Sequence, residues 1–270
     1  MDKIYYSQAD KRWANHPYPS NLHPKATIKS GGCGPTSAAM IVSTLRDTIY
    51  PNQMGDLFRS NGLRAATGTS PNAFTWIANK FNLQVKRSVY INDAVECLKR
   101  GGIVVAYCKA GGLFSTGGHI IVLADITGVL KNTLVVYDPY LYAGKFNSGI
   151  RKKCVSVKGT SCYVSVANFK RYCDYTLYLY EPTSKYKVGQ YVEINMDVLN
   201  TGSYADENML VEYVRKNGKP REQFWVHASL VKNNKLIARA QICYTQGHRY
   251  IVQVFDKQFW VDEDDITKVL

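Results

Sequence analysis

Long apolar runs are absent from this sequence of 270 residues. No stretch approaches the roughly 20 residues that a membrane-spanning helix needs. The first residues, Met1–Tyr6, also lack the hydrophobic core of a secretory signal peptide. We therefore expect no membrane partner, and we expect the protein to accumulate first in a cytoplasm.

Paired cysteine spacing is absent as well. The seven cysteines form an odd set with no metal-knuckle pattern, at positions 33, 97, 108, 154, 162, 173 and 243. This argues against a disulfide framework and against a zinc site. We expect free thiols and no metal or other cofactor.

The basic charge is not concentrated in one cluster. The net charge is +13, and residues 1–183 hold 22 Lys and Arg against 10 Asp and Glu, whereas residues 184–270 hold 12 against 11. An anionic partner for the first part is expected, either nucleic acid or an anionic polymer. Because the basic residues are scattered and no recognised nucleic-acid motif occurs, we expect no nucleic-acid partner.

A candidate nucleophile lies in Gly31–Met40, where Cys33 stands between glycines and precedes an apolar run of helical period. Pro35 suits the first turn of that helix, because a first-turn residue needs no backbone donor. At a helix start, unpaired N–H groups and the helix dipole favour a thiolate. The flanking glycines would let a substrate backbone approach Cys33.

A histidine and a carboxylate are predicted to lie near each other. His119 opens a β-branched run, 120–124, and Asp138 closes the next one, 133–137. In an antiparallel hairpin these two ends are adjacent. Cys33, His119 and Asp138 therefore form the predicted triad of nucleophile, base and orienting carboxylate.

Other polar residues compete for a place in the site. Gln8, in a polar segment closed by Trp13, offers an amide that would stabilise an oxyanion. The competing histidines lie in expected loops or in the second part of the chain, at positions 16, 23, 227 and 248.

The order of elements predicts an α+β first domain. Helices are expected over 51–63, 70–81 and 91–100, with Ser70 as an N-cap, and strands over 103–107, 120–124 and 133–137. The tyrosine- and cysteine-rich segment 149–180 is expected to complete the sheet.

An ordered set of motifs resembles the papain-like cysteine peptidases related to the bacteriocin-leader-processing family, in their cell-wall-lysin form. The set covers roughly residues 4–180 and consists of Tyr6-Ser7-Gln8, Asp10-Lys11-Arg12-Trp13, Ser30-Gly31-Gly32-Cys33-Gly34-Pro35-Thr36-Ser37, Gly68-Thr69-Ser70, Thr116-Gly117-Gly118-His119 and Tyr137-Asp138-Pro139. The resemblance implies a papain-like fold with a helical lobe and an antiparallel sheet. It also implies Cys33 as nucleophile, His119 as base, Asp138 as orienter and Gln8 in the oxyanion hole.

The last third of the chain carries an internal repeat. Gln223–Val226 recurs as Gln258–Val261 in two strand-rich copies, near 190–231 and 236–269. The layout resembles bacterial SH3-like cell-wall-binding domains. Trp225 and Trp260 are expected in the core.

Four tyrosines expected in turns are the candidate wall-ligand residues: Tyr204, Tyr213, Tyr244 and Tyr250. The predicted organisation is a catalytic domain over 1–180, a linker over 181–187 and an all-β, SH3-like barrel over 188–270.

These predictions favour a phage endolysin-type peptidoglycan hydrolase, either an endopeptidase or an amidase. Its partners would be Gram-positive peptidoglycan and the associated anionic wall polymers, which it would reach after release from the host cytoplasm. Two alternatives remain: a cysteine protease that cuts a protein or leader peptide, and a catalytically inactive wall-binding or phage tail protein.

Overall fold

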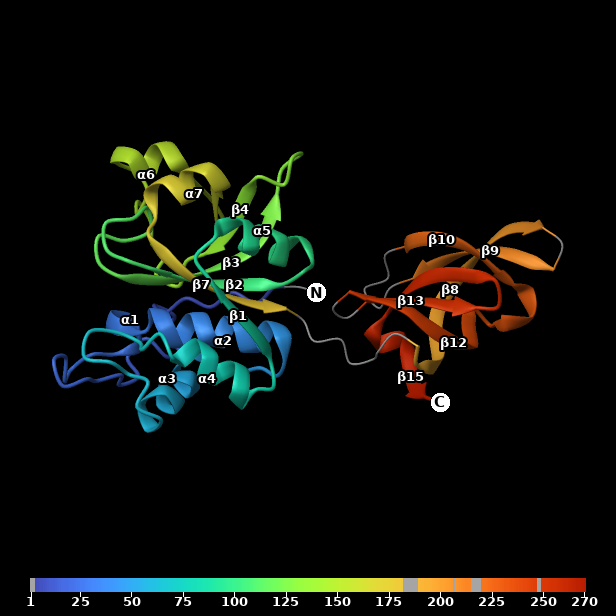
Figure 1. Cartoon of the computed structure of the whole chain (residues 1–270), viewed down its shortest axis with the longest axis horizontal. Coiled ribbons are helices and arrows are strands. Elements are labelled where there is room, and N and C mark those ends of the chain that lie inside the picture. Colours follow the sequence, from blue (N-terminus) through green and yellow to red (C-terminus); the bar gives the residue numbers. More distant parts are fainter. Residues whose placement is uncertain (1–2, 182–188, 206, 215–219, 247–248) are drawn as a thin grey trace. The chain divides into compact units, whose positions relative to one another are not determined.

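The chain divides into two compact units, Met1–Pro182 and Thr183–Leu270, in a computed structural model of the whole chain (Figure 1). The structure describes residues 3–181, 189–205, 207–214, 220–246 and 249–270. Apart from Glu181, the predicted linker lies outside these residues. No helix among them is long and apolar enough to cross a membrane.

The first unit is α+β. Its helices are α1 (Ile28–Gly31), α2 (Cys33–Leu45), α3 (Pro51–Ser60), α4 (Ala73–Lys80), α5 (Ile91–Lys99), α6 (Gly149–Cys154) and α7 (Val166–Tyr172). Its strands are β1 (Gln84–Ser88), β2 (Ile103–Cys108), β3 (His119–Thr127), β4 (Thr133–Tyr137), β5 (Val155–Lys158), β6 (Ser161–Ser165) and β7 (Tyr175–Glu181).

One antiparallel sheet separates two hydrophobic cores. The strand order is β1-β7-β2-β3-β4-β6-β5. Because successive side chains of a strand point to opposite faces, Val105 and Val122 pack with the helices α2 to α4, whereas Val104 and Leu123 pack with α5 and α7. Figure 1 shows α1 to α4 on one side of the sheet and α5 to α7 on the other.

Most predicted elements of this unit are confirmed, with shifted ends. The helix expected over 51–63 ends at Ser60, before Gly62 with its positive φ. The helix expected over 70–81 begins at Ala73 after the N-cap Asn72, so the assignment of Ser70 as N-cap is wrong. Ser70 instead forms the turn before the helix, where its carbonyl accepts from the N–H of Ala73. The segment 149–180 does complete the sheet, through β5, β6 and β7.

The second unit is a nearly closed, barrel-like antiparallel sheet. Its elements are β8 (Tyr191–Ala205), β9 (Asn208–Val214), β10 (Pro220–His227), η1 (Ala228–Leu230), β11 (Val231–Lys232), β12 (Lys235–Gln246), β13 (Arg249–Val254), β14 (Lys257–Asp262), η2 (Glu263–Asp265) and β15 (Ile266–Val269). The long strand β8 joins the parts of the sheet, because it pairs with β9, β12 and β15.

The sequence repeat corresponds to a structural repeat. Each copy runs from a strand through a short 3₁₀ helix into another strand, as β10-η1-β11 and as β14-η2-β15. Phe224 and Phe259, at equivalent positions, stack with ring centroids 4.4 Å apart. The tryptophans take the opposite side of the strand, and Trp225 is 37% exposed, so its predicted place in the core is wrong.

Two of the four candidate wall-ligand tyrosines are buried. Tyr213 and Tyr250 are 1% and 0% exposed, because they lie in β9 and β13 on the inward face rather than in turns. Their hydroxyls bond to carboxylates of η2, Tyr213 to Asp265 and Tyr250 to Glu263. Both side chains therefore tie η2 to the barrel. The expectation that the four candidate tyrosines lie in turns is wrong, because Tyr204 and Tyr244 also lie in strands, β8 and β12.

Candidate active site

Cys33 is the first residue of α2, the helix that crosses the core of the first unit. Nearly all of α2 is buried, so the position of its start is determined by packing on every side. Gly32 separates it from the short helix α1. Cys33 itself is half-buried at the surface end of this helix.

The glycines beside Cys33 are required by packing. A Cβ on Gly34 would lie 2.0 Å from Oγ1 of Thr69, and a Cβ on Gly32 would lie 2.4 Å from the carbonyl oxygen of Ile28. Both positions are therefore closed by the protein's own atoms. The interpretation that these two glycines leave space for a substrate is wrong, because atoms of Thr69 and Ile28 occupy the space beside them.

His119 and Asp138 lie at the paired ends of two neighbouring strands. His119 begins β3, and Asp138 follows the last residue of β4, with β3 and β4 paired antiparallel. Nε2 of His119 lies 2.8 Å from Oδ1 of Asp138. His119 also interacts with Cys33, because the imidazole is what lowers the pKa of the thiol, and since Nε2 faces the carboxylate, Nδ1 is the nitrogen left for the sulfur. The structure thus brings the three predicted residues together.

A hydrogen bond beside Cys33 and His119 links helix α2 to strand β3. Oγ of Ser37, one turn after Cys33, donates to the carbonyl of Ile120 at 3.2 Å. Ile120 directly follows His119 in β3. The bond therefore holds the nucleophile and the histidine, which come from opposite lobes, at a fixed separation.

The site favours an ion pair of thiolate and imidazolium. Burial opposes ionisation of Cys33, but the hydrogen bond and charge of His119 outweigh it and lower the pKa of the thiol. Burial likewise opposes the charge of His119, but its hydrogen bonds to Asp138 and Cys33 raise the pKa of the imidazole to about 9. For Asp138, burial is outweighed by His119 and Lys145, and the pKa of the carboxyl is lowered.

Gln8 lies in the wall of the same site. Its backbone N–H donates to the carbonyl of Pro139, next to Asp138, at 2.7 Å. Its side-chain Nε2 donates to the carbonyl of Lys29 at 2.6 Å, while Oε1 is buried without a hydrogen-bond partner. One N–H of the amide is thus engaged, and the amide has a second N–H to offer.

Lys145 is a member of the site that the sequence did not predict. Its Nζ lies 2.6 Å from Oδ2 of Asp138, and the side chain is buried. No sequence pattern distinguishes this lysine, because it belongs to the irregular segment between β4 and α6. Only the fold of that segment brings it to Asp138.

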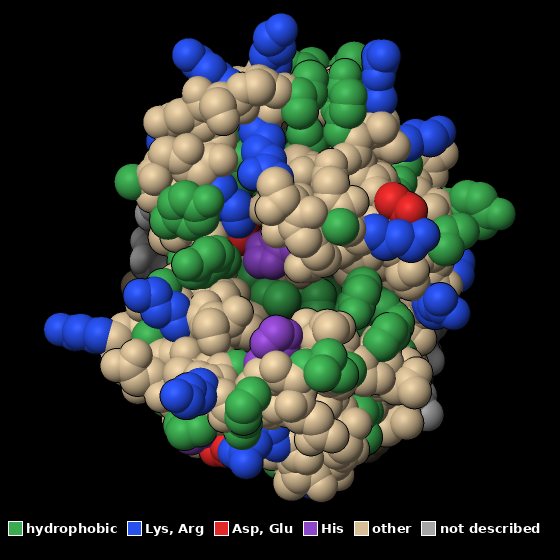
Figure 2. Space-filling view, turned by 90° about the vertical axis from the view of Figure 1, so that its left-hand side faces the viewer, with side chains coloured by type: hydrophobic (Ala, Val, Ile, Leu, Met, Phe, Trp, Pro, Cys, Tyr) green, Lys and Arg blue, Asp and Glu red, His purple; other side chains and the backbone are tan. Residues whose placement is uncertain are grey.

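A hollow crosses the face of the first unit that Figure 2 shows. Hydrophobic side chains line it, histidines stand at its edges, and Lys and Arg side chains surround it with few acidic ones among them. The two views share the same vertical axis, and the hollow lies at the level where the helices α1 to α4 meet the sheet in Figure 1. An extended substrate would find an apolar floor and a basic rim there.

Metal ligands are not gathered at this site. Among the residues that the structure describes, no group of three or more His, Cys, Asp or Glu side chains is placed to hold a metal ion. All seven cysteines are free thiols.

A comparison with protein families decides the class of the first unit. The model of the Peptidase_C39 like family matches residues 2–157, more than half of the chain. The chain belongs to the Peptidase_C39 like family. This Peptidase_C39-like chain is accordingly a relative of the cysteine peptidases, and the matched range includes Gln8, Cys33, His119 and Asp138. No curated protein compared with it gives a match.

Proposed function

We propose that this Peptidase_C39-like chain is a papain-like peptidoglycan hydrolase, which cleaves an amide bond of the bacterial cell wall with Cys33 as nucleophile. The observation that carries the proposal is the contact of His119 with both Cys33 and Asp138 in a chain of this family. The basic surface around the hollow adds support, because Gram-positive walls carry anionic polymers.

The geometry suggests a reaction in two halves. The Cys33 thiolate attacks the amide carbon, and the second N–H of Gln8 together with the backbone N–H of Cys33 stabilises the oxyanion. His119 then gives its proton to the leaving amine, and Asp138 holds the ring in the orientation this needs. In the second half, His119 takes a proton from water, which attacks the thioester and releases the product.

The second unit is proposed to be an SH3-like domain that holds the enzyme on the wall. Of the predicted ligand tyrosines, Tyr204 and Tyr244 are exposed and are retained as candidates. A pocket of about 560 Å³ offers a further site in this unit, between the start of β9, the end of β10, η1 and the turn that joins β13 to β14.

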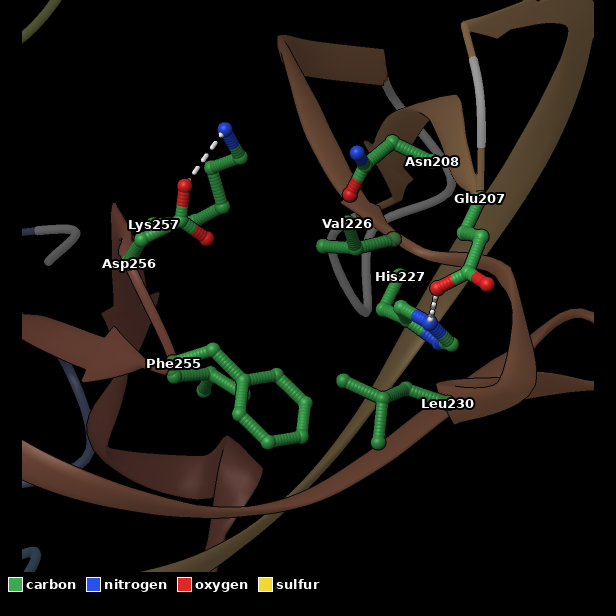
Figure 3. A pocket seen from close by; sticks show the side chains of 9 residues that line it. Glu207, Asn208, Val226, His227, Leu230, Phe255, Asp256 and Lys257 are labelled. Carbon is green, nitrogen blue, oxygen red and sulfur yellow. Dashed lines mark hydrogen bonds and ion pairs between the residues drawn. The ribbon is translucent and has the colours of Figure 1, made fainter.

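Phe255 is an exposed aromatic residue in the wall of that pocket. Figure 3 shows its ring directed toward Leu230 across the pocket, and it is 70% exposed. Its φ of +52° is a left-handed conformation that costs a residue with a Cβ about 1 kcal/mol. On another wall, His227 is held by Glu207 and Ser229. An exposed aromatic ring beside such polar groups suits a sugar ring or a short peptide of the wall.

Two alternatives differ from this proposal in what they predict. A protease that cuts a protein or leader peptide would need no wall-binding unit, whereas an inactive wall-binding or tail protein would need no triad. The contact among Cys33, His119 and Asp138 favours an enzyme over the inactive protein.

Replacement of the nucleophile tests the proposal. We expect Cys33→Ala to abolish the loss of turbidity that the full chain causes in a suspension of susceptible Gram-positive cells, because no other group replaces the thiolate. The matched control is Cys154→Ala, another partly exposed free thiol, which should lyse cells like the parent chain. Full lysis by the Cys33→Ala chain would refute the assignment of the nucleophile.

A further inference from the structure

Behind the triad, on the side of Asp138 away from His119, lies the buried ammonium group of Lys145. Its Nζ donates to Oδ2 of Asp138 at 2.6 Å and to the carbonyl of Tyr140 at 3.0 Å. The side chain is only 4% exposed, and that of Asp138 is 0% exposed. Lysine is almost never buried to this degree without a charged partner.

The carboxylate of Asp138 is held on both oxygens. Oδ1 faces Nε2 of His119 at 2.8 Å and accepts from the backbone N–H of Tyr140 at 2.9 Å, while Oδ2 accepts from Lys145. With both oxygens engaged, the carboxylate has one orientation. The orientation of the His119 ring follows from it.

Aromatic rings enclose the ammonium group of Lys145. The ring centroids of Tyr140, Tyr142 and Phe146 each lie 5.8 Å from Nζ. Rings at this distance stabilise a cation by their quadrupoles. The segment between β4 and α6 thus provides a site for a charged lysine inside the protein.

The charges at the triad balance only when Lys145 is included. In the reactive state Cys33 and Asp138 are negative and His119 is positive, which leaves one net negative charge. Lys145 brings the sum to zero, and a buried net charge is costly.

Other titratable groups near the cluster do not supply this charge. Five of these groups have raised pKa values and are neutral near pH 7: Tyr5, Tyr18, Tyr107, Cys108 and Cys162. Burial is the largest cause of the raised pKa in four of them, whereas for Cys108 the largest cause is a hydrogen bond to Cys173. Arg64, on the helical side of the Cys33 loop, donates to the carbonyls of Tyr18, Ala65 and Gly68 rather than to the triad.

We infer that Lys145 is a positioning residue of the active site, which neutralises Asp138 and fixes its carboxylate toward His119, so that Cys33 ionises without leaving a net buried charge. The inference rests on the proposed role of the triad and extends it by a fourth member. Removal of a nearby positive charge makes every acid of the cluster harder to ionise. Without the charge of Lys145, the Cys33 thiolate should therefore form only at higher pH.

Alkylation of Cys33 by iodoacetamide tests this in the full chain without any substrate, because only the thiolate displaces iodide. The rate at Cys33 is followed by peptide mapping from pH 4 to 10. Lys145→Met keeps the length and packing without the charge, Lys145→Gln keeps an N–H donor without the charge, and Lys145→Arg keeps the charge. The matched control is Lys158→Met, at an exposed position of β5.

We expect the midpoint of thiolate formation to rise by about one pH unit in Lys145→Met and Lys145→Gln, a roughly tenfold slower alkylation below the midpoint. Lys145→Arg and the control should stay close to the parent chain. If Lys145→Met does not fold, Lys145→Gln decides, and a parental midpoint in Lys145→Gln overturns the inference. Failure of the chain to cleave walls would refute the proposed substrate and would leave these midpoints unaffected.

Discussion

At the scale of single residues, His119 determines how the site responds to pH. Burial works against its charge, but the hydrogen bonds to Asp138 and Cys33 prevail and raise the pKa from 6.5 to about 9. The imidazolium is therefore present at pH 7 to 8, ready to protonate a leaving amine. Its contribution to folding stability is complete below pH 6.5 and is lost as the pH rises through about 9.

Asp138→Asn tests this electrostatic arrangement. For the parent chain we expect the rate of amide cleavage to fall above a pH of about 9, where His119 loses its proton. In the variant this alkaline limit should move down toward 6.5, because the amide lacks the charge that favours the imidazolium. Initial rates of release of amino groups from purified walls, measured against pH, show the shift.

The control for that variant is Asp174→Asn, an exposed carboxylate paired with Lys109. Its pH profile should match that of the parent chain. Superimposable alkaline limits of the parent and Asp138→Asn chains would mean that Asp138 does not control the proton of His119.

The residues that the sequence predicted for the site share one property. Cys33, His119 and Asp138 each stand at the end of a helix or strand, where the change of pattern along the chain makes them visible. Lys145 has no such signal, because its contact with Asp138 arises from an irregular segment. The packing around Gly32 and Gly34 could not be predicted from the sequence either, because it involves Ile28 and the distant Thr69.

At the scale of elements, hydrophobic periodicity predicted which segments form helices and strands in the first unit, but not their partners in the sheet. Strand β7, from the tyrosine- and cysteine-rich segment 149–180, lies between β1 and β2 in the sheet. Pairing over such a distance in the sequence leaves no local pattern. In the second unit, the expectation of turns at Tyr213 and Tyr250 fails because both lie in strands, where each shares the inner face with a buried valine two residues away, Val211 and Val252.

The proposed wall-binding pocket can be tested at Phe255, in the turn between β13 and β14. We expect Phe255→Ala, in the full-length Cys33→Ala chain, to weaken binding to purified walls about tenfold, because truncation of an aromatic contact residue costs on the order of 1.4 kcal/mol. The fraction of protein that sediments with walls measures it. The melting temperature should not fall, because the side chain is exposed.

Tyr191→Ala in the same background provides the control for this binding experiment, since Tyr191 is another exposed aromatic residue of the second unit and lies outside the pocket. Equal sedimentation of the Phe255→Ala and Tyr191→Ala chains would remove the pocket from the proposed wall-binding site.

At the scale of the whole molecule, charge is divided unequally along the chain. The excess of basic over acidic residues is 12 over residues 1–183, from 22 and 10, and 1 over residues 184–270, from 12 and 11. The attraction to an anionic wall polymer would therefore belong mainly to the first unit, while the pocket beside Phe255 would supply specific contacts in the second. Salt should weaken the first contribution more than the second.

The most direct test of the central claim is mass spectrometry of the fragments released from purified Gram-positive walls by the full chain and by its Cys33→Ala variant. The parent chain should release fragments with new amino termini, or glycan freed from the first alanine, according to which amide bond is cut. The variant should release neither. Identical fragments from both chains would contradict the role of Cys33, and no fragments from any tested wall would contradict wall hydrolysis.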